Sequence, residues 1–181
     1  MKYLIHKKTD DTKKGFTLVE TLMAISILMI AVIVPLSIVA NALQASYFAR
    51  DQITAAYLAQ DVIEYVRSLR DGDAITSVKT TSPQNSWASA LTACAGANGC
   101  DIDTINGNVA SWSAPLKYDE SSGFYHSSSG SGDASRFARK VKISGNAPEY
   151  KVDVEVTWTG SIASNGNSKI QVSESLFNVW Q

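Results

Sequence analysis

The feature that most constrains this chain is an apolar run that begins abruptly after the Lys-Lys-Gly sequence at 13–15. No charged side chain occurs between Thr21 and Ala49. About 20 helical residues cross the hydrocarbon core of a bilayer, so the run is long enough to span a membrane. One carboxylate, Glu20, lies inside the start of the run, where a charged group is costly unless it is paired or reaches the interface. The sequence therefore predicts an apolar helix with one acidic group, Glu20, that has a functional role.

Basic residues flank this run on one side only. The first 15 residues contain five lysines against two aspartates, whereas the remainder contains 11 basic and 15 acidic residues. The positive-inside rule therefore predicts that residues 1–15 lie in the cytoplasm and the bulk of the chain outside it. No A-x-A cleavage site follows the run directly, so we expect the helix to stay attached. The absence of a basic patch argues against nucleic acid as a partner.

The string GFTLVE at 15–20 follows a short basic leader and precedes the apolar run. This combination resembles the processing site of type IV prepilins and of the related pseudopilins of type II secretion systems. The resemblance implies that a prepilin peptidase removes residues 1–15 by cutting after Gly15. It also implies that Phe16 becomes an N-methylated N-terminus and that Glu20 guides assembly. The implied partners are other pilin subunits, the peptidase/methylase, an assembly platform and, before assembly, membrane lipid.

Cleavage would give Glu20 an electrostatic partner. It creates a positive amino group on Phe16, four residues before Glu20, and positions i and i+4 share a helix face. The two charges can pair within one subunit or between neighbouring subunits. The alternative is that the carboxylate reaches the headgroups at the cytoplasmic surface. One departure from the family is that many major pilins carry proline at the position of Ser37, whereas this chain has Pro35, which removes one helical hydrogen bond.

The apolar pattern continues beyond the expected membrane span of about 16–40 as an amphipathic helix. One stripe recurs at helical spacing, made of Ala55, Leu58, Ala59, Val62, Val66 and Leu69. Gly72 between two aspartates suits a helix stop, so we expect near-continuous helix from about Phe16 to Leu69. The predicted organisation is a leader at 1–15, a helix at 16–70 and an extracytoplasmic β domain at 71–181. The pattern A-x-x-L-A-Q-x-x-I-E-x-x-R at 55–67 is similar to that of minor pilins and of the I-type minor pseudopilins.

The C-terminal part is expected to be a small antiparallel sheet, which gives an α+β, pilin-like fold. Residues 72–115 are rich in polar loop residues and indicate loops with a short helix at about Trp87 to Ala93. Two short strands are expected around the Ser-Ser-Gly turn at 121–123. Three longer alternating strands follow, of which EYKVDVEVTWTG at 149–160 is the clearest. In the last strand Ile170 and Phe177 are out of phase, so we expect a bulge near 173–175.

The two cysteines, Cys94 and Cys100, lie close together in a chain expected outside the cytoplasm, which favours a structural disulfide. Other candidate chemistry is weak. His126 lies in a serine-rich stretch and is expected to be an exposed turn residue. The segment CDIDTINGN at 100–108 resembles a cation loop only loosely and does not have EF-hand spacing. Its Asp101, Asp103 and Asn106 are interpreted as solvated residues that cap turns, so no metal, cofactor or catalysis is expected.

The leading hypothesis is therefore a structural one: a minor pilin that enters the inner membrane as a single-pass precursor and is built into a filament at the cell surface. The alternatives are a pseudopilin of a type II secretion system and a binding module at a pilus tip, with the polar segment at 76–113 as its site.

Overall fold

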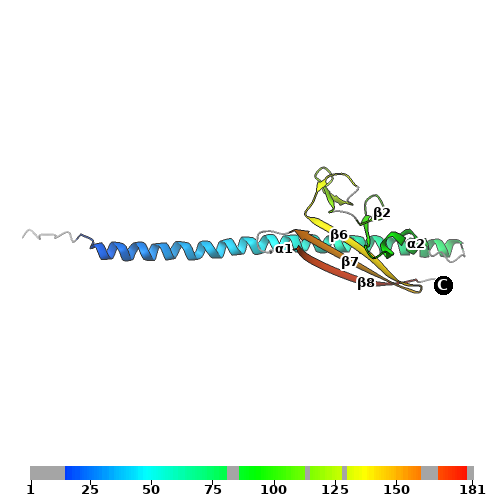
Figure 1. Ribbon diagram of the computed structural model, residues 1–181, viewed down its shortest axis with the longest axis horizontal. Coiled ribbons are helices and arrows are strands. Elements are labelled where there is room, and N and C mark those ends of the chain that lie inside the picture. The colour runs from blue at the N-terminus through cyan, green and yellow to red at the C-terminus, as the bar shows by residue number, and fades with distance from the viewer. Residues whose placement is uncertain (1–14, 81–85, 113–114, 128–129, 160–166, 179–181) are drawn as a thin grey trace, which may run out of the picture. The chain divides into compact units, whose positions relative to one another are not determined.

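The computed structural model describes residues 15–80, 86–112, 115–127, 130–159 and 167–178 (Figure 1). The expectation for the basic leader at 1–14 lies outside these residues. The chain divides into two compact units, Met1–Leu43 and Gln44–Gln181. The fold is α+β, with one long N-terminal helix and antiparallel sheets packed on it, as the sequence predicts.

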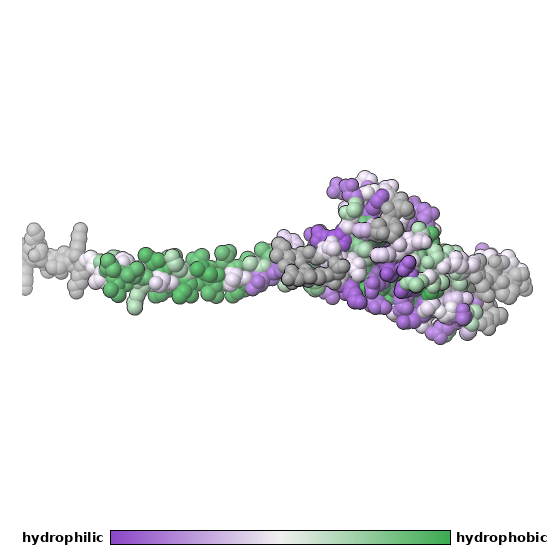
Figure 2. Space-filling view, in the orientation of Figure 1, coloured by the Kyte–Doolittle hydropathy of each residue, from purple (hydrophilic) through white to green (hydrophobic). Residues whose placement is uncertain are grey.

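The first unit consists of the start of helix α1 (Leu18–Thr80). Its apolar side chains are exposed, and Figure 2 shows them as a continuous hydrophobic stretch along the first part of the helix. The most apolar 18-residue window has a mean hydropathy of 2.8 and none of it is buried. This helix is therefore long and apolar enough to cross a membrane, which agrees with the predicted span.

In the second unit, α1 buries the predicted stripe. Ala55, Ala59, Val62 and Val66 are fully buried in the core, and Leu69 packs against it in part. We expected the helix to stop at Gly72, but it continues to Thr80. The reason is tertiary, because the Asp73 carboxylate accepts a hydrogen bond from the Trp87 backbone N–H and Ser77 is buried.

The main sheet has five antiparallel strands in the order β2-β1-β6-β7-β8. Their bounds are β1 Cys100–Asp103, β2 Asn108–Ser111, β6 Phe137–Asn146, β7 Glu149–Thr159 and β8 Asn167–Phe177. Figure 1 shows β6, β7 and β8 as long neighbouring strands. The alternation predicted for β7 is confirmed, because Val152, Val154, Val156 and Trp158 all lie in the core.

The expected bulge in β8 is wrong. The strand pairs with β7 without interruption from Asn167 to Phe177. Leu176 keeps the phase of Ile170 and Val172 and is buried, whereas Phe177 points to the exposed face. Because Leu176 supplies the next inward-pointing apolar side chain, β8 needs no bulge at 173–175.

A second, smaller sheet has the order β4-β3-β5, with β3 at Lys117–Asp119, β4 at Phe124–His126 and β5 at Asp133–Ala134. The β3–β4 pair around 120–123 is the hairpin that the sequence predicts. Tyr125 joins this sheet to the main core, since its ring lies 5.8 Å from that of Phe137 in an edge-on arrangement.

The segment between α1 and β3 is more ordered than expected. It contains helix α2 (Ser86–Ala90), the 3₁₀ helix η1 (Thr92–Ala95) and the hairpin β1–β2, where only loops and one short helix were predicted. Cys94 and Cys100 form the predicted disulfide. Trp87 is a core residue, and Trp112 lies partly exposed under the ammonium group of Lys140, 4.5 Å from the ring centre.

Candidate processing and assembly site

The predicted cleavage bond lies in an accessible, non-helical position. Gly15 and Phe16 precede α1, and none of the other described residues lies within 4 Å of the place where a Cβ of Gly15 would stand. The Phe16 side chain is 82% exposed. A peptidase can therefore approach this bond from several sides without unwinding the helix.

Thr17 caps the N-terminus of α1 and fixes the position of Glu20. The Thr17 Oγ1 accepts a hydrogen bond from the Glu20 backbone N–H at 3.3 Å. The Thr17 carbonyl accepts the first backbone hydrogen bonds of the helix, from Glu20 and Thr21. Thr-x-x-Glu is the spacing of a capping box, and an acidic residue in the first turn interacts favourably with the helix dipole. The backbone of Glu20 is thus fixed in the first turn of the helix.

The residue at which α1 begins, Leu18, affects which amino group could pair with the Glu20 carboxylate. The helical i, i+4 geometry between Phe16 and Glu20 requires the helix to begin at Phe16, two residues earlier than it does. A salt bridge within one subunit therefore needs two more helical residues after cleavage. A salt bridge to the amino group of a neighbouring subunit needs no such extension.

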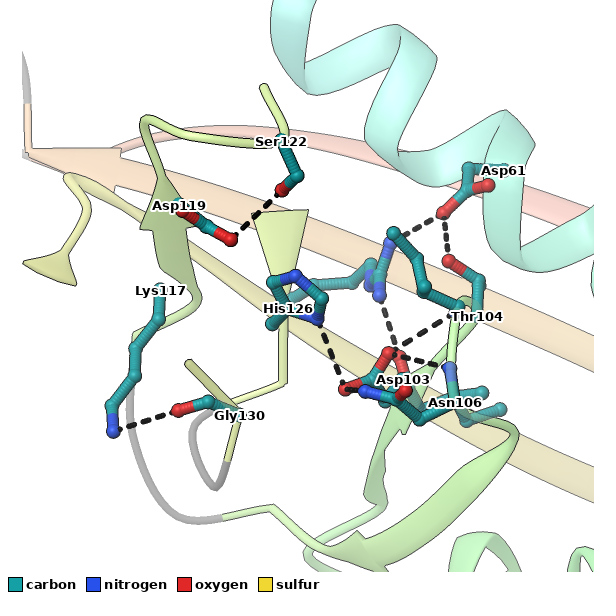
Figure 3. Close-up of polar contacts among 12 residues, drawn as sticks. Asp61, Asp103, Thr104, Asn106, Lys117, Asp119, Ser122, His126 and Gly130 are labelled. Carbon is teal, nitrogen blue, oxygen red and sulfur yellow. Dashed lines mark hydrogen bonds and ion pairs between the residues drawn. The ribbon is translucent and has the colours of Figure 1, made fainter. Parts of the chain in front are cut away.

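A second polar site lies in the second unit, where the helix meets the sheet (Figure 3). Arg139 of β6 is fully buried. Its guanidinium donates to the backbone carbonyls of Leu58 (3.1 Å) and Ile102 (2.6 Å) and to the Asp61 carboxylate (3.2 Å). Burial lowers the pKa of Arg139, and the nearby carboxylates of Asp61 and Asp101 partly offset this effect. One guanidinium thus links α1, β1 and β6.

Two residues near Arg139, His126 and Asp103, differ from what the sequence predicts. His126 is not an exposed turn residue but a buried residue of β4, with Nδ1 3.5 Å from Asp103 Oδ2. Asp103 does cap a turn, since its Oδ1 accepts the backbone N–H groups of Ile105 and Asn106 at 3.1 Å. It is not solvated, however, and neither is Asp101, because both lie buried in β1.

Burial works against ionisation of Asp103. The hydrogen bonds from Asn106 and Ile105, with a contribution from His126, outweigh that effect and hold the pKa of Asp103 below its usual range. Within the part of the chain that the structure describes, no group of three or more His, Cys, Asp or Glu side chains is arranged to hold a metal ion. The geometry is that of a cluster that fastens the helix to the sheet.

Sequence reasoning missed Arg139 and the β1–β2 hairpin, although signals for both were present. Arg139 occupies an inward position of an alternating strand, between Phe137 and Val141. The Asn-Gly pair at 106–107 is a strong hairpin signal between two runs that contain Ile102 and Val109. Gly107 adopts a φ of 70°, which the turn requires and which favours glycine.

Comparison with known proteins bears on the N-terminal site. Residues 11–34 match the prokaryotic N-terminal methylation motif. The chain therefore carries the leader signature of type IV prepilins, and this motif supports a type IV pilin- or pseudopilin-like precursor. The match covers the predicted cleavage bond, Glu20 and the first part of α1. Searches of curated proteins and of solved structures returned no match to the chain.

Proposed function

We propose that this chain is the precursor of a minor pilin, a structural subunit of a type IV pilus-like filament. A prepilin peptidase cuts after Gly15, the new Phe16 amino group is methylated, and the subunit then leaves the membrane for the filament. Glu20 pairs with the N-terminal amino group of a neighbouring subunit and sets its axial position. The second unit remains outside the cytoplasm at every stage and performs no catalysis.

The observation that carries this proposal is the combination of the methylation motif at 11–34 with an accessible bond before a capped helix. The part of α1 that lies in the first unit exposes all of its apolar side chains, so it needs either lipid or other apolar helices around it. A filament subunit meets both environments in turn, lipid before assembly and other subunits afterwards.

Intact-mass analysis of the protein from membranes of peptidase-positive cells tests the processing step. The expected mass is that of a chain starting at methylated Phe16. Gly15→Val is expected to keep the leader, because a bulky residue then stands before the cut, whereas Gly96→Val, in a loop of the second unit, is expected to be processed normally. A wild-type chain still starting at Met1 would refute the proposal.

The pilin and pseudopilin alternatives differ in the machine that assembles the filament. We expect the processed chain in sheared surface filaments from cells that have only the pilus machinery. Its appearance only in cells with a type II secretion system would instead assign it as a pseudopilin.

A further inference from the structure

A hollow of about 310 Å³ opens on the surface of the second unit, beside α1. Its lining comes from three segments, which are α1, the turn between β1 and β2, and the β3–β4 hairpin. This volume is at the lower end of the range for small-ligand pockets, so the hollow is large enough for one side chain or one small molecule. It is distinct from the processing site, and Asp61 is the residue that it shares with the cluster around Arg139.

Aromatic side chains form much of the wall of the hollow. Tyr57 of α1 and Phe124 of β4 are 68% and 56% exposed, and Tyr125 also lines it. Ile105, in the turn after β1, adds an exposed aliphatic side chain. Aromatic and aliphatic side chains exposed together beside a concave surface are typical of binding sites, and the faces of aromatic rings attract cations.

The acidic group of the hollow is the Asp61 carboxylate, whose side chain is 50% exposed. Its Oδ2 accepts hydrogen bonds from the Thr104 hydroxyl (2.6 Å) and from the Arg139 guanidinium (3.2 Å). Figure 3 shows both dashed lines ending at the same oxygen of Asp61. Among the described residues, no group donates a hydrogen bond to Oδ1. Asp61 therefore has one oxygen fixed by the fold and one that is available to a donor from outside.

The groups around Asp61 carry excess negative charge. The buried guanidinium of Arg139 interacts with three carboxylates, those of Asp61, Asp101 and Asp103. Negative charge therefore exceeds positive charge among these four groups. Asp101 and Asp103 are buried, where salt screens a charge much less than it does at the surface.

The positive charges near the hollow are either paired or exposed. The Tyr125 side chain lies in the field of Arg136, Asp51 and Arg50. Arg136 and Asp51 form an ion pair at 3.1 Å. Arg50 is exposed, so salt screens its charge more than that of the buried carboxylates. The hollow thus combines aromatic walls with a carboxylate in a negative environment, which fits a cationic ligand.

We propose that this hollow binds an arginine side chain of a partner protein. The planar guanidinium can lie against the ring of Phe124 or Tyr57 while one of its N–H groups donates to Asp61 Oδ1. A quaternary ammonium group has no donor for this oxygen, and a lysine ammonium group is more strongly hydrated, so it loses more on entering an apolar hollow.

The occupant is an arginine of a different protein rather than of a second copy. Four of the five arginines of this chain already form ion pairs within it. The inference concerns the second unit alone, so it goes beyond the proposed function and stands whether or not the chain enters a filament.

Titration of the full-length chain in lipid nanodiscs with the peptide acetyl-Gly-Arg-Gly-amide tests the ligand class. Amide NMR spectra are expected to show shifts confined to lining residues such as Leu58, Thr104 and Gly123. The same peptide with citrulline in place of arginine keeps the shape without the charge. It is expected to bind about tenfold more weakly, because the charged hydrogen bond and the cation–π contact are lost. Tetramethylammonium, which has no donor, is expected to bind more weakly than the arginine peptide.

Matched substitutions locate the site. Asp61→Asn keeps one oxygen for Thr104 and Arg139 and is expected to weaken binding of the arginine peptide about tenfold. Asp71→Asn, in the same helix but outside the hollow, is expected to leave binding unchanged.

A second pair of substitutions tests the aromatic wall without touching the cluster around Arg139. Phe124→Ala is expected to weaken binding of the arginine peptide about threefold through loss of a cation–π contact. Phe177→Ala, at a phenylalanine of β8 that is 55% exposed, is the matched control and is expected to have no effect.

Several outcomes would overturn the inference. Equal binding of the arginine and citrulline peptides would exclude a cationic ligand, and shifts outside the hollow would show that the location is wrong. Tetramethylammonium that binds as tightly as the arginine peptide would replace arginine by a quaternary ammonium group. If Arg50 of a second copy were the occupant, the lining residues would shift when the chain is diluted without any peptide, and a separate partner would be excluded.

Discussion

Arg139 shows how a single residue can hold two elements together. A guanidinium without access to water is tolerated because two of its three nitrogens, Nη1 and Nη2, donate to oxygens of α1 and β1, while Nε has no hydrogen-bond partner among the described residues. Removing it leaves the Leu58 and Ile102 carbonyls buried without that donor. Each such loss costs about 1–3 kcal/mol, and breaking a buried charged pair costs about 3–5 kcal/mol.

We therefore expect Arg139→Leu to lower the free energy of unfolding by about 3 kcal/mol. The control is Arg70→Leu, since the one ion pair that Arg70 forms with the described residues is to its neighbour Asp71, 2.7 Å away near the surface. That change is expected to cost less than about 1 kcal/mol. Denaturant unfolding followed by the fluorescence of the buried Trp87 and Trp158 measures both variants. Equal effects of the two substitutions would contradict the role of Arg139.

Asp103 makes the stability of the second unit depend on pH. Hydrogen bonds to the ionised form outweigh burial and place its pKa in the folded state below the unfolded value of about 3.9. The resulting stability is therefore present above about pH 4 and is lost as the pH falls through the pKa of the folded state.

The free energy of unfolding measured between pH 7 and pH 2 checks this dependence. Asp103→Asn is expected to be less stable than the wild type at pH 7, with the difference shrinking toward pH 2. Asp119 and Asp153 also have lowered pKa values, so the variant keeps part of the acid sensitivity. If the free energies of unfolding of the wild type and of Asp103→Asn differed by the same amount at every pH, ionised Asp103 would not be the source of the pH-dependent stability.

Among the elements, β8 is one of the two strands that lie at an edge of the main sheet. Arg67 of α1 fastens it through two hydrogen bonds of 2.7 Å to the two carboxylate oxygens of Glu174. This fork geometry is specific to arginine, since a lysine cannot form both bonds in parallel. It ties the edge strand to the helix beneath it.

We expect Arg67→Lys to speed amide hydrogen exchange in β8 while leaving β6, in the middle of the sheet, unchanged. Hydrogen exchange read by mass spectrometry resolves the two strands. Arg70→Lys serves as the control and is expected to change neither strand. Faster exchange spread evenly over the sheet would mean that the substitution destabilises the whole unit instead.

The disulfide acts on the segment that carries η1 and β1. It closes a loop with a sequence separation of six, so the chain-entropy relation predicts a stabilisation of about 2 kcal/mol. Replacing both cysteines by serine is expected to cost at least this much, because both sulfur atoms are buried. Equilibrium unfolding of the double variant measures the loss. Reduction of the wild type should reproduce most of it, and an unchanged midpoint after reduction would contradict the prediction.

The elements that could be predicted from the sequence are those whose pattern is local. The alternation of β7 and the stripe of α1 each repeat over many residues, so tertiary contacts reinforce them. The end of α1 could not be predicted, because Gly72 is a local stop signal that the contacts of Asp73 and Ser77 override. The strand β1 was missed because its aspartates are acceptable inside the protein only once Arg139, Asn106 and the turn are in place.

The same distinction between local sequence patterns and tertiary contacts applies to the candidate site. Gly15, Phe16 and Glu20 are contiguous, so their motif can be recognised in the sequence alone. The cluster of Arg139, Asp61 and His126 comes from three separate elements, of which α1 is far from the two strands in the chain, and only the fold brings them together.

At the scale of the whole molecule, the two units have different requirements. The second unit has its own core, with Trp87, Leu116 and Leu176 among the buried residues. In the first unit, none of the described residues 15–43 is buried, so this stretch depends on what surrounds it. A change confined to Glu20 should therefore affect assembly without affecting the fold of the second unit.

Glu20→Ala is expected to block incorporation into filaments while membrane insertion and the unfolding of the second unit stay as in the wild type. Removing the carboxylate makes the helix more apolar, so insertion into lipid is not impaired, but the amino group of a neighbouring subunit loses its partner. Glu20→Gln separates charge from hydrogen bonding, since it keeps the shape and the capping-box spacing with Thr17. If the ion pair drives docking, Glu20→Gln should fail as Glu20→Ala does, whereas recovery with glutamine would assign the residue to capping. Quantitative immunoblots of sheared filaments and of membranes measure both variants, and wild-type filament content with Glu20→Ala would show that assembly does not need this carboxylate.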